Sequence, residues 1–194
     1  MRSSMLVVAA LLAVSFAVAQ DPSQMTPEQQ VEMEAYMKAG TPGPQHAALA
    51  KHAGTYDVAV KSWMAPDGPP IESTGSATRE MTLDGRVMIE TFKGSMMGMP
   101  FTGMGTHGFD NVTAKHWSTW MDSMSTGLMV SEGTCDADNA CTYTGSWNDP
   151  ITKGSVEARM KSWWTGPDTQ VFEMYGPGKD GKEMKMMELT YTKK

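Results

Sequence analysis

The sequence is poor in the residues that build metal and redox centres. It contains two cysteines and four histidines, and it has no H-E-x-x-H, H-x-H or C-x-x-C motif. A dedicated metal site is therefore not expected. A G-x-S-x-G elbow is also absent, and the serines fall in strand-like patterns. We predict no enzymatic activity, no catalytic residues and no cofactor.

Positive charge and long apolar runs are scarce as well. Lysine and arginine number 16 against 22 acidic residues, for a net charge of −6. This balance argues against nucleic acid or an anionic membrane as a partner. No stretch beyond residue 20 is apolar enough to span a bilayer, so no membrane span is predicted.

The first residues, MRSSMLVVAALLAVSFAVAQ, follow a different pattern. A positive charge at Arg2 precedes an apolar run from Met5 to Val14, and Ala17-Val18-Ala19 has the small-x-small form of a cleavage site. These features predict a signal peptide over residues 1–19, and hence a periplasmic or secreted protein. Disulfides persist in such compartments.

Residues 20–44 are predicted to form an N-terminal helix and a linker. The stretch TPEQ has the capping-box pattern with proline at the first helical position, and Gly40 ends the helix. TPGP then forms the linker, and a second short helix is expected in PQHAALAKHAG, with Leu49 facing inward.

Residues 45–194 are predicted to form one β-barrel domain. From Thr55 onward, apolar residues alternate with period two and turn residues recur at short intervals. The expected strands are Thr55–Met64, Glu72–Leu83, Arg86–Ser95, Phe101–Phe109, Lys115–Ser123, Gly127–Cys135, Cys141–Asn148, Ser155–Trp164, Gln170–Gly176 and Glu183–Thr192. Without helices to supply parallel crossovers, an all-β, antiparallel up-and-down barrel of about ten strands is predicted, since closure removes exposed edges.

The dipeptide Asp84-Gly85 predicts a hairpin with a type I′ turn. A two-residue loop places three pairs on one face, namely Met81 with Met88, Arg79 with Glu90, and Ala77 with Phe92. This face is largely apolar, so we expect it to point inward. Arg79 and Glu90 would then lie inside the barrel or at its rim.

The stretch GTCDADNACTYTGSW predicts a second hairpin. If Cys135 faces Cys141, Gly133 lies opposite Tyr143, an arrangement in which an aromatic ring packs over a glycine. We therefore predict a cross-strand disulfide between the two cysteines. Its small loop restrains few unfolded conformations, so the bond fixes this hairpin more than it stabilises the whole domain.

A third hairpin is predicted in YGPGKDGKEM around Asp180-Gly181. A two-residue loop pairs Tyr175 with Met186 and places Glu173 opposite Glu188. Two like charges in this position are unfavourable unless they face solvent or contact a cation. Solvent exposure is the simpler expectation.

Methionine is abundant, with 20 residues in all. Met96, Met97 and Met99 cluster in SMMGMP and could bind Cu(I) through their thioethers. Because methionine is enriched along the whole chain, flexible packing is the default explanation for the cluster. A structural or stress-related module whose methionines scavenge oxidants is a second alternative.

Trp117 and Trp120 lie on opposite faces of one predicted strand, so aromatic surface is expected both inside and outside the barrel. An inward Trp120 near Arg79 and Glu90 would suit an amphipathic ligand with a polar head. Simple core filling is the alternative explanation for these rings.

Many short motifs occur in an order that resembles a known family. They include PGPQHAALAKHAGTYDV, TLDGR, MMGMPFTGMGTHGFDN, STWMDSMSTGLM and VFEMYGPGKDGKEMKMMELTYTKK. From Pro42 to Lys194 the chain is similar to the exported bacterial family known as domain of unknown function 1579. The resemblance implies a calycin-like barrel, similar in outline to lipocalins, and implies no activity. Tyr56 stands where that family usually has tryptophan, and the cysteine pair is particular to this chain.

The leading hypothesis is an exported barrel that binds a small hydrophobic or amphipathic ligand in its interior, since barrels of this size can enclose a cavity. The candidate ligand-binding residues are Arg79, Glu90, Met81, Met88, Phe92 and Trp120.

Overall fold

A computed structural model describes residues 25–194. The predicted signal peptide, residues 1–19, lies outside the described residues. The chain divides into two compact units, one ending at Lys38 and the other spanning Ala39–Lys194. No helix in residues 25–194 is long and apolar enough to cross a membrane.

The helix α1 spans Pro27–Gly40 and begins with the predicted capping box. The backbone amide of Gln29 donates to the Thr26 hydroxyl at 3.3 Å, and the Thr26 amide donates to Gln29 Oε1 at 2.9 Å. Both groups lack intrahelical partners, so the exchange stabilises the first turn. None of the residues of α1 is buried.

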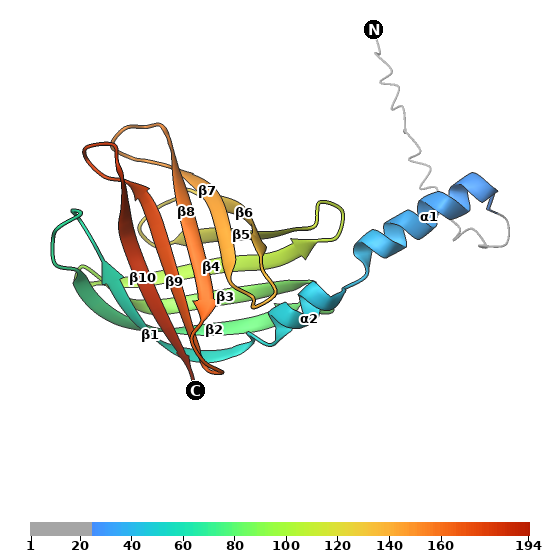
Figure 1. Ribbon diagram of the computed structural model, residues 1–194, viewed down its shortest axis with the longest axis horizontal. Coiled ribbons are helices and arrows are strands. Elements are labelled where there is room, and N and C mark those ends of the chain that lie inside the picture. The colour runs from blue at the N-terminus through green and yellow to red at the C-terminus, as the bar shows by residue number, and fades with distance from the viewer. Residues whose placement is uncertain (1–24) are drawn as a thin grey trace, which may run out of the picture. The chain divides into compact units, whose positions relative to one another are not determined.

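The second unit contains the short helix α2, Pro44–Ala50, followed by ten strands within the described residues (Figure 1). The strands are β1 (Gly54–Ser62), β2 (Ile71–Thr82), β3 (Val87–Met96), β4 (Met99–Asp110), β5 (Lys115–Asp122), β6 (Met129–Cys135), β7 (Cys141–Asn148), β8 (Ser155–Trp164), β9 (Thr169–Pro177) and β10 (Glu183–Lys193). Each lies within two residues of its predicted bounds.

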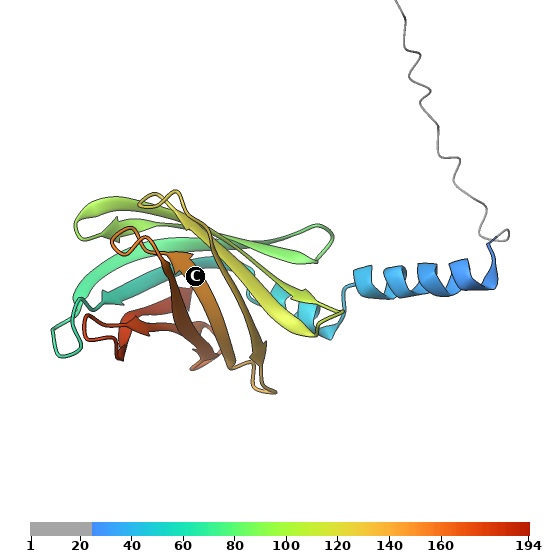
Figure 2. The same ribbon diagram turned by 90° about the horizontal axis from the view of Figure 1, so that it is seen from above.

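The strands form a closed, all-antiparallel barrel, as predicted. Each strand pairs with its neighbours in the chain, and β1 pairs with β10 to complete the ring. Figure 2 shows the strands from a second direction. Closure leaves no sheet edge exposed. It also brings the first and last strands side by side, which places residues far apart in the sequence within one interior.

The hairpin of β2 and β3 has the predicted register, with Arg79 opposite Glu90. Asp84 and Gly85 have φ angles of 52° and 84°, the positive values that a type I′ turn requires. Because the register fixes which side chains alternate inward, it places the Arg79 and Glu90 side chains on the same side of the sheet.

The hairpin of β6 and β7 confirms the predicted disulfide. Cys135 pairs with Cys141 in the ladder, with Cα atoms 3.9 Å apart, and the two sulfurs are bonded. Gly133 lies opposite Tyr143. A Cβ at Gly133 would lie 2.7 Å from the Tyr143 ring, so this position requires glycine.

The predicted register of β9 and β10 is correct for Glu173 with Glu188 but wrong near the turn. Tyr175 pairs with Lys185 rather than Met186, because the register shifts between Lys185 and Met187. The cause is the turn. Of Asp180 and Gly181, the glycine has a positive φ, 77°, whereas a two-residue type I′ loop needs positive values at both.

The shift gives Lys185 a structural role on the outer wall. Its ammonium contacts Glu173 and lies 2.8 Å from Glu188 Oε2. Lys61 Nζ also lies 3.8 Å from Glu188 Oε1, so two cations compensate the two carboxylates, which are not simply exposed. The Tyr175 hydroxyl also donates to Glu173 at 2.7 Å.

Inward glycines allow large rings to lie flat against the barrel wall. A Cβ at Gly103 would lie 2.2 Å from the Trp120 ring, and one at Gly75 would lie 2.3 Å from Phe92. Both rings belong to the interior, where Phe92 is buried and Trp120 packs against the core. The glycine positions are thus set by packing, not by turns.

We predict that Gly103→Ala destabilises the protein by about 1–3 kcal/mol, because the Trp120 ring cannot retreat. The indole N–H of that ring is held by Asp122 at 3.1 Å. The matched control is Gly166→Ala between β8 and β9, where nothing lies within 4 Å and φ is not positive. Urea denaturation followed by tryptophan fluorescence measures both. Equal midpoints for the two variants would contradict the packing explanation.

Candidate functional site

The barrel encloses a cavity of about 400 Å³. Most of its wall is apolar, formed by Leu49, Val60, Met88, Phe92, Phe101, Trp120, Met160, Phe172, Met174, Met187 and Leu189, among others. This volume falls within the range of about 300–1,000 Å³ that is usual for sites of small ligands.

The cavity extends toward both ends of the barrel. At one end its wall includes Leu49 of α2. This helix lies next to the C-terminal end of β4, where the rings of His46 and Phe109 make a T-shaped contact. At the opposite end, Met124 and Leu128 of the β5–β6 loop line it. The helix therefore covers one end, and the loop lies at the other.

A buried ion pair lies in this cavity, close to the β2–β3 turn. Arg79 Nε donates to Glu90 Oε2 at 2.7 Å, and Arg79 Nη1 donates to Gln170 Oε1 at 2.7 Å. The Tyr191 hydroxyl donates to the other carboxylate oxygen, Oε1, at 3.0 Å. Both oxygens of Glu90 thus accept a hydrogen bond, as a buried carboxylate requires.

Two tyrosine rings enclose the guanidinium. The Arg79 Cζ atom lies 4.3 Å from the centroid of Tyr191 and 4.8 Å from that of Tyr56. Electron-rich ring faces stabilise a cation that has been removed from water. The Tyr56 hydroxyl donates to the backbone carbonyl of His52 at 2.7 Å, which fixes the ring.

The pair stays charged despite its burial. Burial by itself would raise the pKa of Glu90, but the adjacent Arg79 more than offsets this, and the pKa is lowered overall. Burial likewise opposes the charge on Arg79, yet Glu90 offsets it and the pKa of Arg79 is raised. Burial also raises the pKa of Tyr191, which remains a hydrogen-bond donor.

Two histidines face this network. Nε2 of His107 lies 3.9 Å from Glu90 Oε2, beyond hydrogen-bond distance. Burial lowers the pKa of His107, although Glu90 opposes the shift. Burial and then the charge of Arg79 lower the pKa of His52 to about 4, and smaller contributions come from His107, Lys193 and His116. Both rings are therefore neutral at pH 7.

Five of the six predicted ligand-binding residues line the cavity, namely Arg79, Glu90, Met88, Phe92 and Trp120. Met81 does not belong to the lining and is half-buried. Its inward direction follows from the register, but it occupies the last inward position before the turn and so lies at the rim. Whether the five bind a ligand stays a prediction.

Sequence patterns missed the polar partners that complete the network, Gln170, Tyr191 and His107. Gln170 and Tyr191 come from β9 and β10, which meet β2 and β3 only because the barrel closes. His107 continues the inward row of Phe101, Gly103 and Gly105 along β4, so the period-two alternation could have identified it.

The methionine cluster lies at the β3–β4 turn. Met96 lines the cavity and packs against the core, while Met97 and Met99 are about half exposed, at 51% and 49%. No cluster of three or more histidine, cysteine or acidic residues suited to a metal occurs in residues 25–194. The copper hypothesis stays a prediction that no observation here favours.

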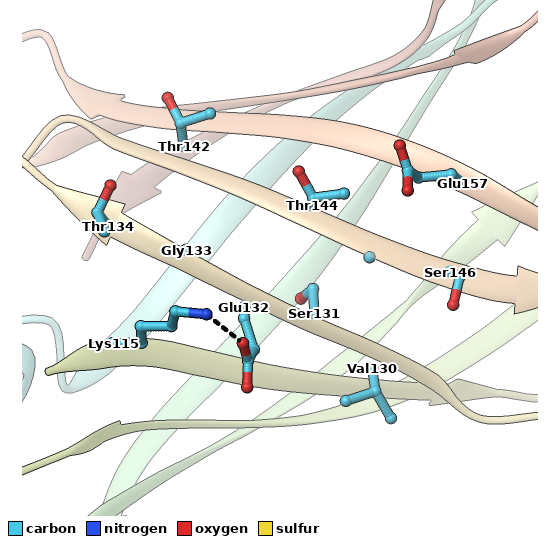
Figure 3. A pocket seen from close by; sticks show the side chains of 11 residues that line it. Lys115, Val130, Ser131, Glu132, Gly133, Thr134, Thr142, Thr144, Ser146 and Glu157 are labelled. Atoms are coloured by element: carbon cyan, nitrogen blue, oxygen red, sulfur yellow. Dashed lines mark hydrogen bonds and ion pairs between the residues drawn. The ribbon is translucent and has the colours of Figure 1, made fainter. Parts of the chain in front are cut away.

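A second hollow, of about 580 Å³, lies on the outer wall of β6 and β7 (Figure 3). Its floor consists of short hydroxyl side chains such as Thr134, Thr142 and Thr144, and an exposed ion pair between Lys115 and Glu132 borders it. Short side chains on an exposed sheet account for its shape. The buried charges and the apolar lining are inside the barrel, so the candidate site is there.

We predict that Arg79→Met destabilises the protein by about 3–5 kcal/mol, because it leaves Glu90 as an unpaired buried charge. The double variant Arg79→Met/Glu90→Met should lose less stability than Arg79→Met, although Gln170 and Tyr191 each lose one hydrogen-bond partner. Urea denaturation of wild type, single and double variants tests this. A double variant no more stable than the single one would refute the pairing argument.

The lowered pKa of His52 predicts a dependence of stability on pH. The unfolded chain takes up a proton below about pH 6.5, whereas the folded protein does so near pH 4, so stability falls as the pH drops through this window. One such group changes the free energy of unfolding by at most about 1.4 kcal/mol per pH unit.

The variant His52→Phe keeps a ring against Trp164, whose centroid lies 4.8 Å from that of His52, and removes the titration. We expect its urea midpoint to decline less than that of wild type between pH 7 and about pH 5. Parallel declines in the two proteins would show that His52 does not contribute.

Comparison with known sequences gives a family for the chain. No curated protein matches it. A family described as "Protein of unknown function (DUF1579)" matches residues 41–193, which cover α2 and all ten strands. The chain therefore belongs to the family of proteins of unknown function DUF1579.

Proposed function

We propose that this protein binds a small, partly apolar ligand inside its barrel and acts as an exported carrier or sensor rather than an enzyme. One observation carries the proposal, the cavity of about 400 Å³ whose apolar wall ends at the buried Arg79–Glu90 network. Apolar cavities with a few convergent polar groups are the usual form of ligand sites.

The polar groups support binding more than catalysis. Arg79 and Glu90 are engaged with each other, with Gln170 and with Tyr191, so neither is free to act as an acid or a base. A general base must lie within hydrogen-bond distance of the proton that it removes and be free to accept it. A satisfied ion pair instead provides a fixed dipole that can orient a ligand.

Export is supported by the disulfide and by the signal-like start of the sequence. The bond between Cys135 and Cys141 is of a kind that persists in oxidising compartments. The run from Met5 to Val14 followed by Ala17-Val18-Ala19 has the order of a signal peptide. The proposed site of action is the periplasm or the exterior.

The proposal is tested by filling the cavity. Met174 lines it from β9, and Met174→Trp adds volume there. We expect this variant to bind the neutral, apolar dye N-phenyl-1-naphthylamine at least about tenfold more weakly than wild type, as measured by dye fluorescence. Circular dichroism should show an intact sheet.

The matched control is Val130→Trp, on the outer hollow and half exposed. It should leave dye binding unchanged. Wild-type protein that fails to bind the dye would contradict the proposal, as would a loss caused by Val130→Trp and not by Met174→Trp. Native mass spectrometry of the purified protein gives a second test, since a retained small molecule of constant mass is expected.

A further inference from the structure

One polar atom in the cavity has no partner. Among the described residues, the buried side-chain polar atoms without a hydrogen bond are His107 Nε2 and Trp164 Nε1. The Trp164 ring packs on His52 and is not part of the cavity wall, whereas His107 is. An unsatisfied buried polar group is destabilising, so a hydrogen-bond partner is expected for the Nε2 atom.

A glycine of the same strand lies close to this atom. Gly105 lies opposite Glu90 in the ladder, and a Cβ there would be 3.3 Å from His107 Nε2 and 3.1 Å from the Trp120 ring. His107, Glu90 and Trp120 line one polar region of a cavity whose wall is mostly apolar.

This polar region has no spare positive charge. Apart from histidines, Arg79 is the one cationic side chain that the described residues contribute to the cavity wall. Its charge is compensated by Glu90 at 2.7 Å. Asp122 is a further acid on the wall. A carboxylate placed beside His107 would lie near Glu90 with no cation of its own, and burial of an unpaired charge is strongly unfavourable.

A hydroxyl group meets the requirements of this polar region. It both donates and accepts, so it can satisfy His107 Nε2 in either tautomer. Glu90 Oε2 lies 3.9 Å from that nitrogen, so a hydroxyl positioned beside both can also donate to the carboxylate. The remaining wall suits an apolar chain.

We propose that the cavity selects apolar molecules that end in an uncharged hydroxyl group over those that end in a carboxylate, and that Glu90 is the residue that sets this preference. The inference rests on the proposed function. It adds the chemical class of the head group and a specificity-determining residue, acting by repulsion of the wrong ligand.

The test compares 1-dodecanol with dodecanoate, which differ in the head group. Each displaces N-phenyl-1-naphthylamine from the wild-type protein at pH 7.5. We expect dodecanol to bind about tenfold or more tightly than dodecanoate. Dodecanoate binding as tightly as dodecanol, or more tightly, would overturn the inference.

Glu90→Gln tests the assigned residue. Glutamine keeps the shape of the side chain and leaves Arg79 with an uncompensated charge, so dodecanoate should gain affinity and the preference should disappear or reverse. An unchanged ratio of the two affinities would contradict the role of Glu90.

His107→Phe provides a second variant that does not depend on the ion pair. It should weaken the binding of dodecanol by about fivefold to tenfold and leave the binding of the dye and of dodecanoate unchanged. Equal losses for all three ligands would refute the head-group contact. If the dye binds wild type but the alcohol is not preferred, this inference alone falls, whereas failure of the dye to bind removes the proposed function as well.

Discussion

The ion pair of Arg79 and Glu90 is the interaction around which the barrel interior is organised. Its two members face each other across the β2–β3 hairpin, but their other partners come from the last strands. Gln170 on β9 and Tyr191 on β10 reach them because β10 pairs with β1. The pair can remain buried and charged only in the closed barrel, so fold and site depend on each other.

Packing around the pair leaves room where a protein core would normally be filled. Large rings such as Phe92 and Trp120 lie flat over Gly75 and Gly103, so the aromatic side chains cover the wall rather than cross the lumen. Flexible thioethers form much of the remaining wall. A hollow, mostly apolar interior that contains a buried ion-pair network is the result.

Local patterns in the sequence predict much of this fold. Asp84-Gly85 fixed the register that turns Arg79 and Glu90 inward, and the spacing of Cys135 and Cys141 predicted their disulfide. These features are set by a few adjacent residues, whose turn geometry determines the pairing of the strands that follow.

Other features depend on contacts between distant segments, which periodicity does not report. The register shift at Met186 arises because, of Asp180 and Gly181, the glycine alone takes a positive φ. The β2–β3 loop contains the same dipeptide, Asp-Gly, so the sequence does not distinguish the two loop conformations. Tyr191 and Gln170 lie in strands whose pattern marks them as inward, yet nothing local indicates that they meet Arg79. They meet because the pairing of β1 with β10 closes the barrel.

The methionines offer the most direct measurement of the central claim, that a ligand occupies the lumen. Methyl NMR of the labelled protein, titrated with a neutral apolar compound, can report on inward Met88, Met160 and Met187 and on outward Met104 and Met121. The account predicts shifts for the inward methyl groups and none for the outward ones. Shifts confined to Met104 and Met121, or no shifts at all, would contradict it.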